Sequence, residues 1–295
     1  METLINQYLD YLIVERNFSP RTVEAYEHDL GKFTGFLQAN GRSDVLAVTQ
    51  EDVSHFLSEC ADTNSAVTLT RKLFAIRSLF KYLLRKKLIV VNPTSEIEKM
   101  KLPQKQPAYL TESEYRNLIE TVKREAAPYD RLRDIAIVLL LLGTGIRLSE
   151  LVGLTLDRVS LEKTGRSIKV RGKGDKERTI PLMGEVVSVL ETYLKHRPKV
   201  TSDHLFISRR GDTLHPRSVY GLVKKYLQKS DIQKTKAAVH SLRHTFGTSL
   251  MNNGVNIVVI QELLGHKKLE TTRRYLHINN IDLRNAVDSL VLSKP

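Results

Sequence analysis

The sequence lacks the features that would place it in a membrane or an oxidising compartment. Cys60 is the only cysteine among 295 residues, which excludes an internal disulfide and fits a cytoplasmic protein. The longest apolar run, Ile135 to Leu142, has the length of a buried helix and is too short to cross a bilayer. The N-terminus has acidic residues and no basic segment, so we expect no signal peptide.

Acidic residues are too few to balance the basic ones. The chain has 46 Lys and Arg against 33 Asp and Glu, which gives a net charge of +13. Residues 1–110 carry 14 basic and 13 acidic side chains, whereas residues 111–295 carry 32 and 20, an excess of 12. A basic field of this size favours a polyanionic partner, most simply nucleic acid. A basic surface that only faces solvent is the alternative.

One segment has no acidic residue at all. Between Asp62 and Glu96 there are seven basic side chains and no carboxylate. Residues 65–85 have helical periodicity, with basic residues at every fourth position of one stripe and apolar residues opposite. Such a helix is suited to lie against a DNA backbone, although a solvated helix or a helix on an anionic membrane would have the same pattern. The candidate DNA contacts of this segment are Arg71, Lys72, Arg77, Lys81 and Arg85.

Start and stop signals predict a first domain of about four helices. Ser19-Pro20 is a helix start, with Pro at the first helical position, and Thr49 to Asp52 is an acidic capping box. Three prolines and weak periodicity mark Lys86 to Leu110 as a linker, and we place the domain boundary between residues 104 and 105. The four helices are expected at residues 1–16, from Pro20 to about Asn40, from Thr49 onward and at 65–85.

The second domain is predicted to be mainly helical with a small sheet. A capping box at Thr111 to Glu114 opens its first helix, and Gly143-Thr-Gly145 stops a very apolar helix from Arg131 to Leu142. Between Asp157 and Leu182 the apolar period changes to two, which predicts short antiparallel strands. We expect strands at residues 159–161, 167–170 and 178–181, and further helices at residues 184–196 and 216–228.

The turn between the second and third strands carries Lys173 between two glycines, where it could reach a ligand. This Gly-x-Gly is not a dinucleotide fingerprint because no helix follows, and it lacks the GK[ST] ending of a P-loop. An exposed lysine in a turn is usually only solvated, so this signal is weak alone. Basic residues near this hairpin and near the helix at 216–228 are further candidate DNA contacts, namely Arg171, Lys176, Arg178, Arg209 and Arg217.

Isolated arginine and histidine residues are candidate site residues. Arg147 starts a helix beside a buried one, where a guanidinium needs a partner or an anion, and Glu150 one turn later could hold it. A structural Arg–Glu pair is the competing interpretation. His240 and Arg243 point the same way from a helix start. His240 and His244 have zinc-ligand spacing, but neither an HExxH motif nor paired cysteines accompany them, so we expect no metal.

The segment from Gln261 to His277 carries the most informative pair of side chains. A short apolar helix is expected to end at Gly265 in a left-handed conformation, and His266 follows it. Tyr275 lies nine residues further on. A tyrosine hydroxyl is a poor nucleophile at neutral pH because its pKa is about 10, and it becomes useful where cations stabilise the phenolate and the phosphorane. The basic residues upstream could supply such a phosphate clamp.

Four segments, in this order, resemble the motifs of the tyrosine recombinase family. They read GTGIRLSELVGL, VRGKGDKERTIPL, HSLRHTFGTSLMNNGV and IQELLGHKKLETTRRYLH, and they cover roughly Leu140 to His277. The resemblance is closest to the cellular Xer branch, the XerC and XerD type, whose length and four-helix N-terminal domain are also similar. One such motif would be weak evidence, whereas four in order, each with the residue that the chemistry needs, are specific.

The resemblance implies that Tyr275 is the nucleophile. In the family this tyrosine attacks a scissile DNA phosphate and leaves a 3′-phosphotyrosine and a free 5′-hydroxyl. Lys173 matches the hairpin lysine that protonates the leaving 5′-oxygen, and His240 matches the residue that acts in general acid–base catalysis near the tyrosine. No nucleotide is implied, because the phosphotyrosine ester keeps the bond energy for religation.

The resemblance also implies the phosphate clamp. Arg147 and Arg243 match the arginines that bind the nonbridging oxygens, for which planar guanidinium groups are suited. His266 matches the residue that bonds the phosphate, and Glu150 would support Arg147. No metal is implied, because the arginines neutralise the charge that a magnesium pair neutralises in other enzymes.

The implied architecture is a mainly α fold in which two domains form a C-shaped clamp on double-stranded DNA. Residues 1–104 would be the N-terminal four-helix core-binding domain. Residues 105–295 would be the mainly helical catalytic domain, with a small three-stranded antiparallel sheet. A C-terminal helix at about 279–290 would pack into a neighbouring protomer, or else on its own domain. The assembly would be a homotetramer, or a heterotetramer with a paralogous recombinase, on two DNA sites, and a DNA translocase could activate it.

We therefore expect a site-specific recombinase that works through a Holliday junction and resolves chromosome dimers at a short palindromic site. The nearest alternative is the integrase or transposase of a mobile element, with the same chemistry on other DNA. A type IB topoisomerase-like enzyme also forms a phosphotyrosine, but the Xer-like first domain argues against it. The complete set of six matching residues argues against a catalytically inactive DNA-binding protein, and membrane binding through the basic helix ranks last.

Overall fold

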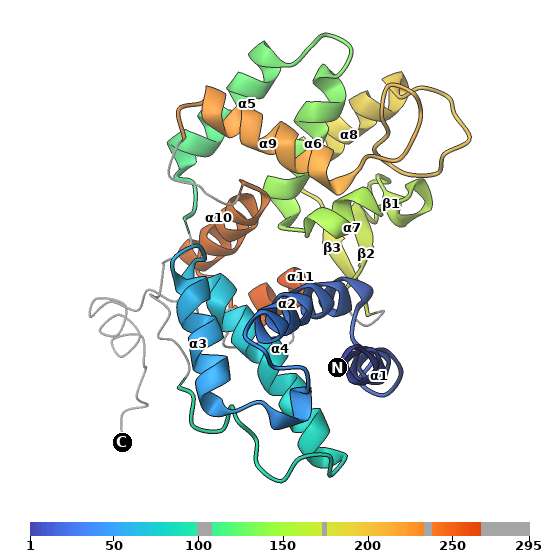
Figure 1. Ribbon diagram of the computed structural model, residues 1–295. Helices are drawn as coiled ribbons and strands as arrows, with labels where there is room; N and C mark the ends of the chain where they lie inside the picture. The colour runs from blue at the N-terminus through green and yellow to red at the C-terminus, as the bar shows by residue number, and fades with distance from the viewer. Residues whose placement is uncertain (99–107, 173–175, 233–237, 267–295) are drawn as a thin grey trace, which may run out of the picture. The chain divides into compact units, whose positions relative to one another are not determined.

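The chain divides into two compact units, residues 1–104 and 105–295 (Figure 1). The predicted fold class is confirmed, since both units are mainly helical and the second adds a small antiparallel sheet. No helix in the part of the chain described below is long and apolar enough to cross a bilayer. The predicted helix at about 279–290 lies outside the described residues. The computed structural model describes residues 1–98, 108–172, 176–232 and 238–266.

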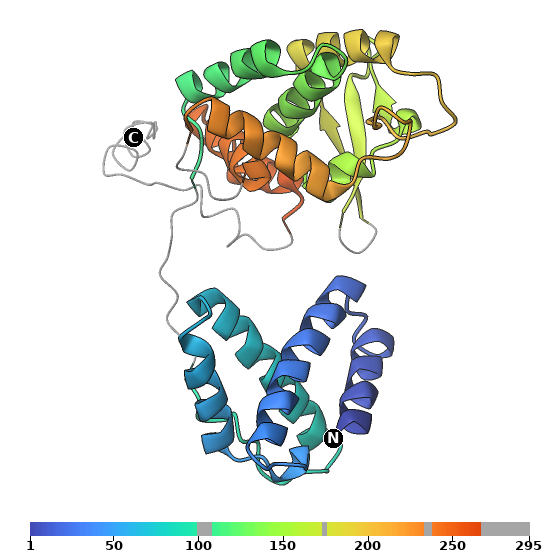
Figure 2. The same cartoon turned by 45° about the horizontal axis from the view of Figure 1, so that its top comes forward.

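The N-terminal unit is a helix bundle with its elements in the predicted order (Figure 2). Pro20 stands at the start of α2. The predicted capping box of α3 is present, because Thr49 and Asp52 each accept a hydrogen bond from the other's backbone N–H. Large side chains such as Tyr8 and Phe33 fill the core. The elements are α1 (Glu2–Val14), α2 (Pro20–Ala39), the 3-10 helix η1 (Val45–Ala47), α3 (Gln50–Ala61) and α4 (Ala66–Arg85).

Helix α4 has the two predicted faces, with one exception. Its predicted apolar face is 5% exposed or less, and Lys81 lies exposed on the other side. Lys72 is only 2% exposed, and its ammonium lies 3.7 Å from the buried carboxylate of Asp29. It stands three residues after Leu69 and four before Ile76, on the apolar side of the helix. The prediction that Lys72 contacts DNA is therefore wrong, because a charge inside the bundle does not reach a phosphate.

Three other basic residues of α4 have partners within the unit. Arg71 donates to the Asp29 carboxylate at 2.5 Å, and Arg77 donates to the carbonyl of Ile97. Arg85 lies 3.5 Å from a carboxylate just beyond α1. The side chains of Arg71 and Arg85 are still 43% and 50% exposed. These residues can thus still meet a polyanion at the surface, and their contact with DNA stays a prediction.

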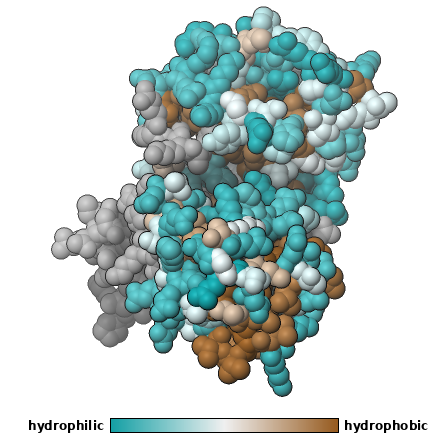
Figure 3. All heavy atoms as spheres, in the orientation of Figure 1, coloured by the Kyte–Doolittle hydropathy of each residue, from teal (hydrophilic) through white to brown (hydrophobic). Residues whose placement is uncertain are grey.

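Apolar side chains also gather on the surface of the N-terminal unit, as the brown region of Figure 3 shows. The segment after α4 exposes Leu88, Val90 and Val91 at 44%, 93% and 74%. Exposed apolar surface of this kind commonly marks a contact with another macromolecule. A phosphate backbone would meet the basic face of α4 instead of this segment.

The C-terminal unit is built around α6, which packs against α5, α8 and α10. The predicted capping box at Thr111 opens α5. Helix α6 runs two residues past its predicted end, and a Cβ on Gly143 would lie 2.8 Å from Val186 of α8, so glycine here permits close packing. The helices are α5 (Glu112–Glu125), α6 (Arg131–Thr144), α7 (Leu148–Val152), η2 (Leu156–Arg158), α8 (Gly184–His196), α9 (Pro216–Lys229), α10 (Ala238–Asn252) and α11 (Ile257–Leu264).

The predicted three-stranded antiparallel sheet is present, in the order β1-β2-β3. Ile168 pairs with Ile180 and Val170 with Arg178, so these residues share the buried face. The hairpin between the second and third strands closes with Gly172 N–H donating to the Lys176 carbonyl at 2.8 Å. The strands are β1 (Val159–Ser160), β2 (Ser167–Arg171) and β3 (Glu177–Pro181).

Candidate active site

Arg147 is held at the start of α7 by a carboxylate one turn later. Glu150 accepts Arg147 Nη1 on Oε1 at 2.8 Å and the Arg147 backbone N–H on Oε2 at 2.7 Å. The pair predicted from the spacing is therefore present. The Glu150 side chain is 2% exposed, whereas that of Arg147 is 34% exposed. Arg147 thus keeps a surface on which it can meet an anion.

Arg178 binds the same carboxylate, a contact that was not predicted. Its Nη1 and Nη2 donate to the two Glu150 oxygens at 2.8 and 2.9 Å, and its Nε donates to the Leu263 carbonyl at 2.8 Å. The side chain is 10% exposed. Arg178 was predicted to contact DNA, but it points inward because it shares the buried face of β3 with Ile180. Its observed partners make it part of the internal support of the site.

The ion pairs keep Glu150 charged. Burial by itself raises the pKa of this carboxyl group, but the hydrogen bonds from Arg178 and Arg147 outweigh burial and lower the pKa to about 2. Glu150 is therefore an anion at any pH at which the protein works, and it attracts both guanidinium groups. Its role is to orient them, because a side chain 2% exposed has little access to a substrate.

Arg243 reaches the same place from α10. It is 7% exposed, its Nη1 donates to the Gly145 carbonyl at 2.6 Å, and its Nη2 donates to the Leu264 carbonyl. Arg147 Nη2 donates to the Gly265 carbonyl at 2.8 Å. The two arginines thus bind carbonyl groups at the C-terminal ends of α6 and α11, which helices leave without internal partners. Arg147 and Arg243, distant in the sequence, are brought together here.

Glycine is required at both of these helix ends. Gly145 and Gly265 are left-handed, with φ of 60° and 63°, which confirms the predicted conformation of Gly265. A Cβ on Gly145 would lie 2.5 Å from the Phe246 ring, and a Cβ on Gly265 would lie 2.9 Å from Arg178 Nη1. A larger residue at either position would displace a side chain or strain the backbone next to the arginines.

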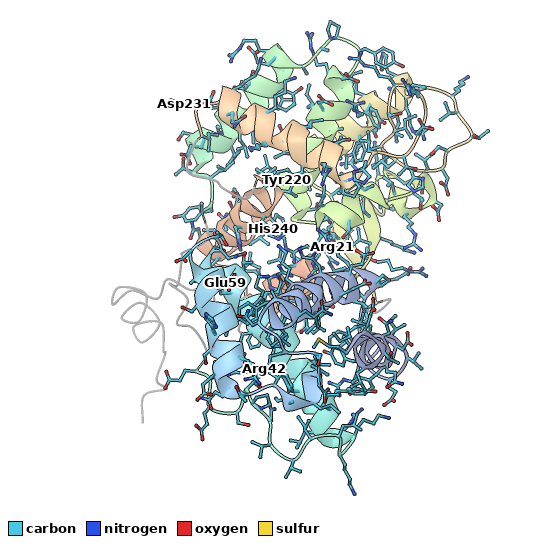
Figure 4. The ribbon with its side chains drawn as sticks, in the orientation of Figure 1. Arg21, Arg42, Glu59, Tyr220, Asp231 and His240 are labelled. Atoms are coloured by element: carbon cyan, nitrogen blue, oxygen red, sulfur yellow. The ribbon has the colours of Figure 1, made fainter. Side chains whose placement is uncertain are left out.

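His266 follows Gly265 directly and is half-buried. Burial and the positive charges of Arg243 and Arg147 lower its pKa to about 4. Burial and the same two arginines also lower the pKa of His240. Figure 4 labels this residue on α10, which packs against α9. Both imidazoles are therefore neutral at pH 7, and a neutral imidazole can accept or donate a proton.

An open cleft of about 780 Å³ lies over these residues. Arg147, Lys176, Arg178 and His266 line it, together with Val258 of α11. Its basic lining residues, Arg147, Lys176 and Arg178, outnumber its acidic ones, Glu177 and Glu262. Such a cleft is suited to an oxyanion that spreads negative charge over several oxygens, as a phosphodiester does.

The remaining predicted DNA contacts lie at the surface of the C-terminal unit. Arg171, Lys176 and Arg217 are exposed, and their contact with DNA stays a prediction. Arg209 is 59% exposed, but its Nη2 lies 2.6 Å from Asp130 Oδ2. An ion pair of this kind is weak at an exposed site. The contact of Arg209 with DNA therefore also stays a prediction.

Two of the six predicted catalytic residues, Lys173 and Tyr275, lie outside the described residues and stay predictions. Arg147 and His266 line the cleft, and Arg243 binds the end of α11 just before His266. His240 is close enough to the two arginines for their charges to lower its pKa. The support from Arg178 and from the carbonyl groups of α11 was not predicted.

We expect His266 to make the C-terminal unit less stable in mild acid. In the unfolded chain His266 takes up a proton near pH 6.5, whereas in the fold it stays neutral down to about pH 4. Acidification through this range therefore favours the unfolded state. His266→Gln should flatten the fall in urea midpoint over this range. The same fall in the variant as in the wild type would contradict the lowered pKa.

Comparisons with known proteins match both units. Residues 108–281 match the phage integrase family, and residues 5–87 match the phage integrase N-terminal SAM-like domain. The tyrosine recombinase XerD of Yersinia pestis is 38% identical over 287 residues, which cover 95% of this chain and 94% of that protein.

Two solved structures have a similar fold. The XerH site-specific recombinase bound to difH substrate, in a pre-cleavage complex, has a TM-score of 0.76 at 26% identity and covers 97% of this chain and 84% of its own. The Tn1549 transposon integrase in complex with a circular intermediate DNA has a TM-score of 0.81 at 20% identity. The match covers 98% of this chain and 99% of the integrase chain. The second likeness is one of fold alone.

Proposed function

The chain belongs to the phage integrase family and is a tyrosine recombinase of the Xer type, and from this premise we propose that Tyr275 is its nucleophile. The Tyr275 oxygen attacks the scissile phosphorus, a bond from phosphorus to this oxygen forms, and the bond to the 5′-oxygen breaks. His240 takes the phenol proton, and Lys173 gives a proton to the leaving 5′-oxygen. The products are a 3′-phosphotyrosine and a 5′-hydroxyl, and attack by another 5′-hydroxyl reverses the step on a new strand.

The observation that supports this mechanism most is the gathering of Arg147, Arg243 and His266 at the ends of α6 and α11. A guanidinium has five N–H donors, and Arg147 uses one from each Nη for Glu150 and Gly265. It therefore keeps donors for a nonbridging phosphate oxygen. The phosphorane carries more negative charge than the ground-state diester, so fixed cations stabilise it preferentially.

We propose a double-stranded DNA recombination site as the substrate. The excess of 12 positive charges in residues 111–295 supports this, and so do the DNA complexes of the XerH recombinase and the Tn1549 integrase. Strand exchange would pass through a Holliday junction in a tetramer on two sites, formed by this chain alone or with a paralogous recombinase. A DNA translocase would be an activator, and the setting would be cytoplasmic.

Within this class, we propose the resolution of chromosome dimers at a short palindromic site. Identity of 38% over nearly the whole length of a XerD protein supports this role. Integration or excision of a mobile element is the second candidate, because a transposon integrase has the same fold at a TM-score of 0.81. The two roles share the chemistry and differ in the DNA site.

A plasmid recombination assay tests the role. Plasmids would carry two copies either of a palindromic site from the host chromosome or of the ends of any mobile element around the gene. Deletion between the chromosomal copies is the expected product. Deletion between the element ends alone would overturn the chromosomal role and favour the second candidate.

The basic face of α4 should contribute to DNA affinity through Lys81. Each phosphate contact that is lost lowers the slope of log Kd against log salt by about one. We expect Lys81→Ala to lower the slope by about this amount. Lys72→Met should leave the slope unchanged, because the buried Lys72 reaches no phosphate. Equal slopes for Lys81→Ala and the wild type would mean that Lys81 contacts no phosphate and that this face of α4 only faces solvent.

A further inference from the structure

We infer that Arg178 is a positioning residue for strand cleavage: it balances the charge of Glu150, so that Arg147 keeps its positive field at the phosphate, and it fixes the end of α11 ahead of His266. The inference rests on the proposed function, because it gives Arg178 a part in that reaction. Arg178 itself need not touch the DNA. Its side chain is 10% exposed and all three of its nitrogens have partners inside the unit.

The charge balance follows from the sharing of one carboxylate. Glu150 accepts two hydrogen bonds from Arg147 and two from Arg178, all between 2.7 and 2.9 Å. With Arg147 as its only partner, the carboxylate would cancel the charge of that arginine. With Arg178 present, the three groups carry a net positive charge. Because the side chains of Glu150 and Arg178 are 2% and 10% exposed, solvent screens their charges less than it screens surface charges, and the difference acts on a phosphate bound at Arg147.

The same side chain fixes the turn that precedes His266. Arg178 Nε donates to the Leu263 carbonyl at 2.8 Å, and its Nη1 would lie 2.9 Å from a Cβ on Gly265. Arg147 Nη2 binds the carbonyl of Gly265 at 2.8 Å. The end of α11 therefore lies between two guanidinium groups that share one carboxylate. Losing Arg178 would free the turn on one side, and a small displacement of a phosphate-binding group costs a large factor in rate.

Arg178 also connects three segments of the C-terminal unit. It belongs to β3, it binds the carboxylate of α7, and it binds a carbonyl of α11. In the sequence, Lys173 lies between β2 and β3, outside the described residues. Arg178 thus ties the hairpin strand to the arginine and histidine of the clamp, which gives it a positioning role that a surface cation would lack.

The test compares four variants in one assay. Arg178→Gln removes the charge and most of the bonds. Glu150→Gln removes the carboxylate, and the double variant removes both charges while keeping polar groups of similar size. Arg133→Gln is the matched control, because Arg133 is also largely buried, at 15% exposed, and binds carboxylates of its own at Asp130 and Asp134. Single-turnover formation of the covalent adduct and DNA affinity would be measured for each, with thermal melting as a check of folding.

We expect Arg178→Gln to lower the rate constant of adduct formation by about 100-fold, with little change in DNA affinity. The double variant should be about tenfold faster than Arg178→Gln alone, because it no longer has an uncompensated carboxylate beside Arg147. Arg133→Gln should cleave at the wild-type rate. An Arg178→Gln rate equal to the wild-type rate, or a double variant no faster than Arg178→Gln, would overturn the inference.

An NMR titration of His266 separates this inference from the proposed function, since it needs no DNA. Removing the Arg178 charge leaves Glu150 in excess, so the imidazole should titrate at a higher pH in Arg178→Gln and return toward the wild-type value in the double variant. If these shifts occur but the wild type forms no adduct, the proposed function fails and the charge balance stands. If adducts form and neither the rates nor the titration respond to Arg178→Gln, the inference fails and the proposed function stands.

Discussion

Tyr275→Phe should abolish covalent attachment of the protein to DNA while leaving DNA binding unchanged. The substitution removes one oxygen, the atom that would bond to phosphorus, and a phenylalanine ring keeps the shape of the side chain. Loss of a nucleophile costs about 10⁴-fold or more in rate, so no adduct should be visible on a denaturing gel. Affinity should persist because the basic surface and the arginine clamp are intact.

Tyr129→Phe is a matched control for this result. Tyr129 is 62% exposed and packs near Arg209, at a distance in the sequence from every predicted catalytic residue. It should form the adduct at the wild-type rate. An adduct that still forms in Tyr275→Phe would contradict the assignment of Tyr275 as the nucleophile. Loss of DNA binding in that variant would mean that the substitution had also disturbed the DNA-binding surface.

Arg243→Lys should lower the rate of strand cleavage by about 100- to 1000-fold, which corresponds to about 3–4 kcal/mol of transition-state stabilisation. The substitution keeps the positive charge and loses the planar fork. Arg243 binds the Gly145 and Leu264 carbonyl groups with two different nitrogens. The single nitrogen of a lysine cannot reproduce that bridge and also hold a phosphate oxygen in a fixed direction.

The control for this prediction is Arg197→Lys. Arg197 also binds backbone carbonyl groups, those of Ser202, His204 and Leu205, but it contacts none of the residues of the cleft in these bonds. It should lose some stability and cleave DNA at the wild-type rate once folded. If Arg243→Lys cleaved as fast as Arg197→Lys, charge alone would account for the clamp and the fork geometry would be irrelevant.

Elements whose signals are local could be predicted from the sequence. The capping boxes at Thr49 and Thr111 formed as predicted, because a cap depends on residues three positions apart. Helix α8 also matches its predicted bounds, Gly184 to His196. Helix α6 ends two residues later than predicted, because its left-handed cap is Gly145, whereas Gly143 stays helical and permits close packing against α8.

Two basic residues have inward partners that the sequence did not indicate, because those partners are distant in the chain. Lys72 and Arg178 were predicted to contact DNA, yet they bind Asp29 and Glu150 inside their units. In both cases the apolar periodicity of the helix or strand indicated that the side chain points inward. Lys72 lies on the apolar side of its helix, and Arg178 stands two residues before the buried Ile180, hence on the same face of its strand. The positive charge of the two residues suggested an exposed position, whereas the periodicity correctly indicated a buried one.

The internal support of the candidate site was predicted only in part. Spacing indicated that Glu150 could hold Arg147, and the structure has that bond. The convergence of Arg147 and Arg243 on the carbonyl groups of α6 and α11 depends on packing between segments far apart in the chain. A one-dimensional pattern does not specify such contacts, so Arg178 was found only in the structure.

The most direct test of the central claim is to map the covalent bond. The protein would be trapped on a nicked duplex that carries a candidate recombination site, with EDTA present, and the attached peptide would be identified by mass spectrometry. We expect a DNA 3′-phosphate on the peptide that contains Tyr275, in the same yield with and without EDTA. Attachment to another residue, or loss of attachment with EDTA, would contradict the proposed mechanism.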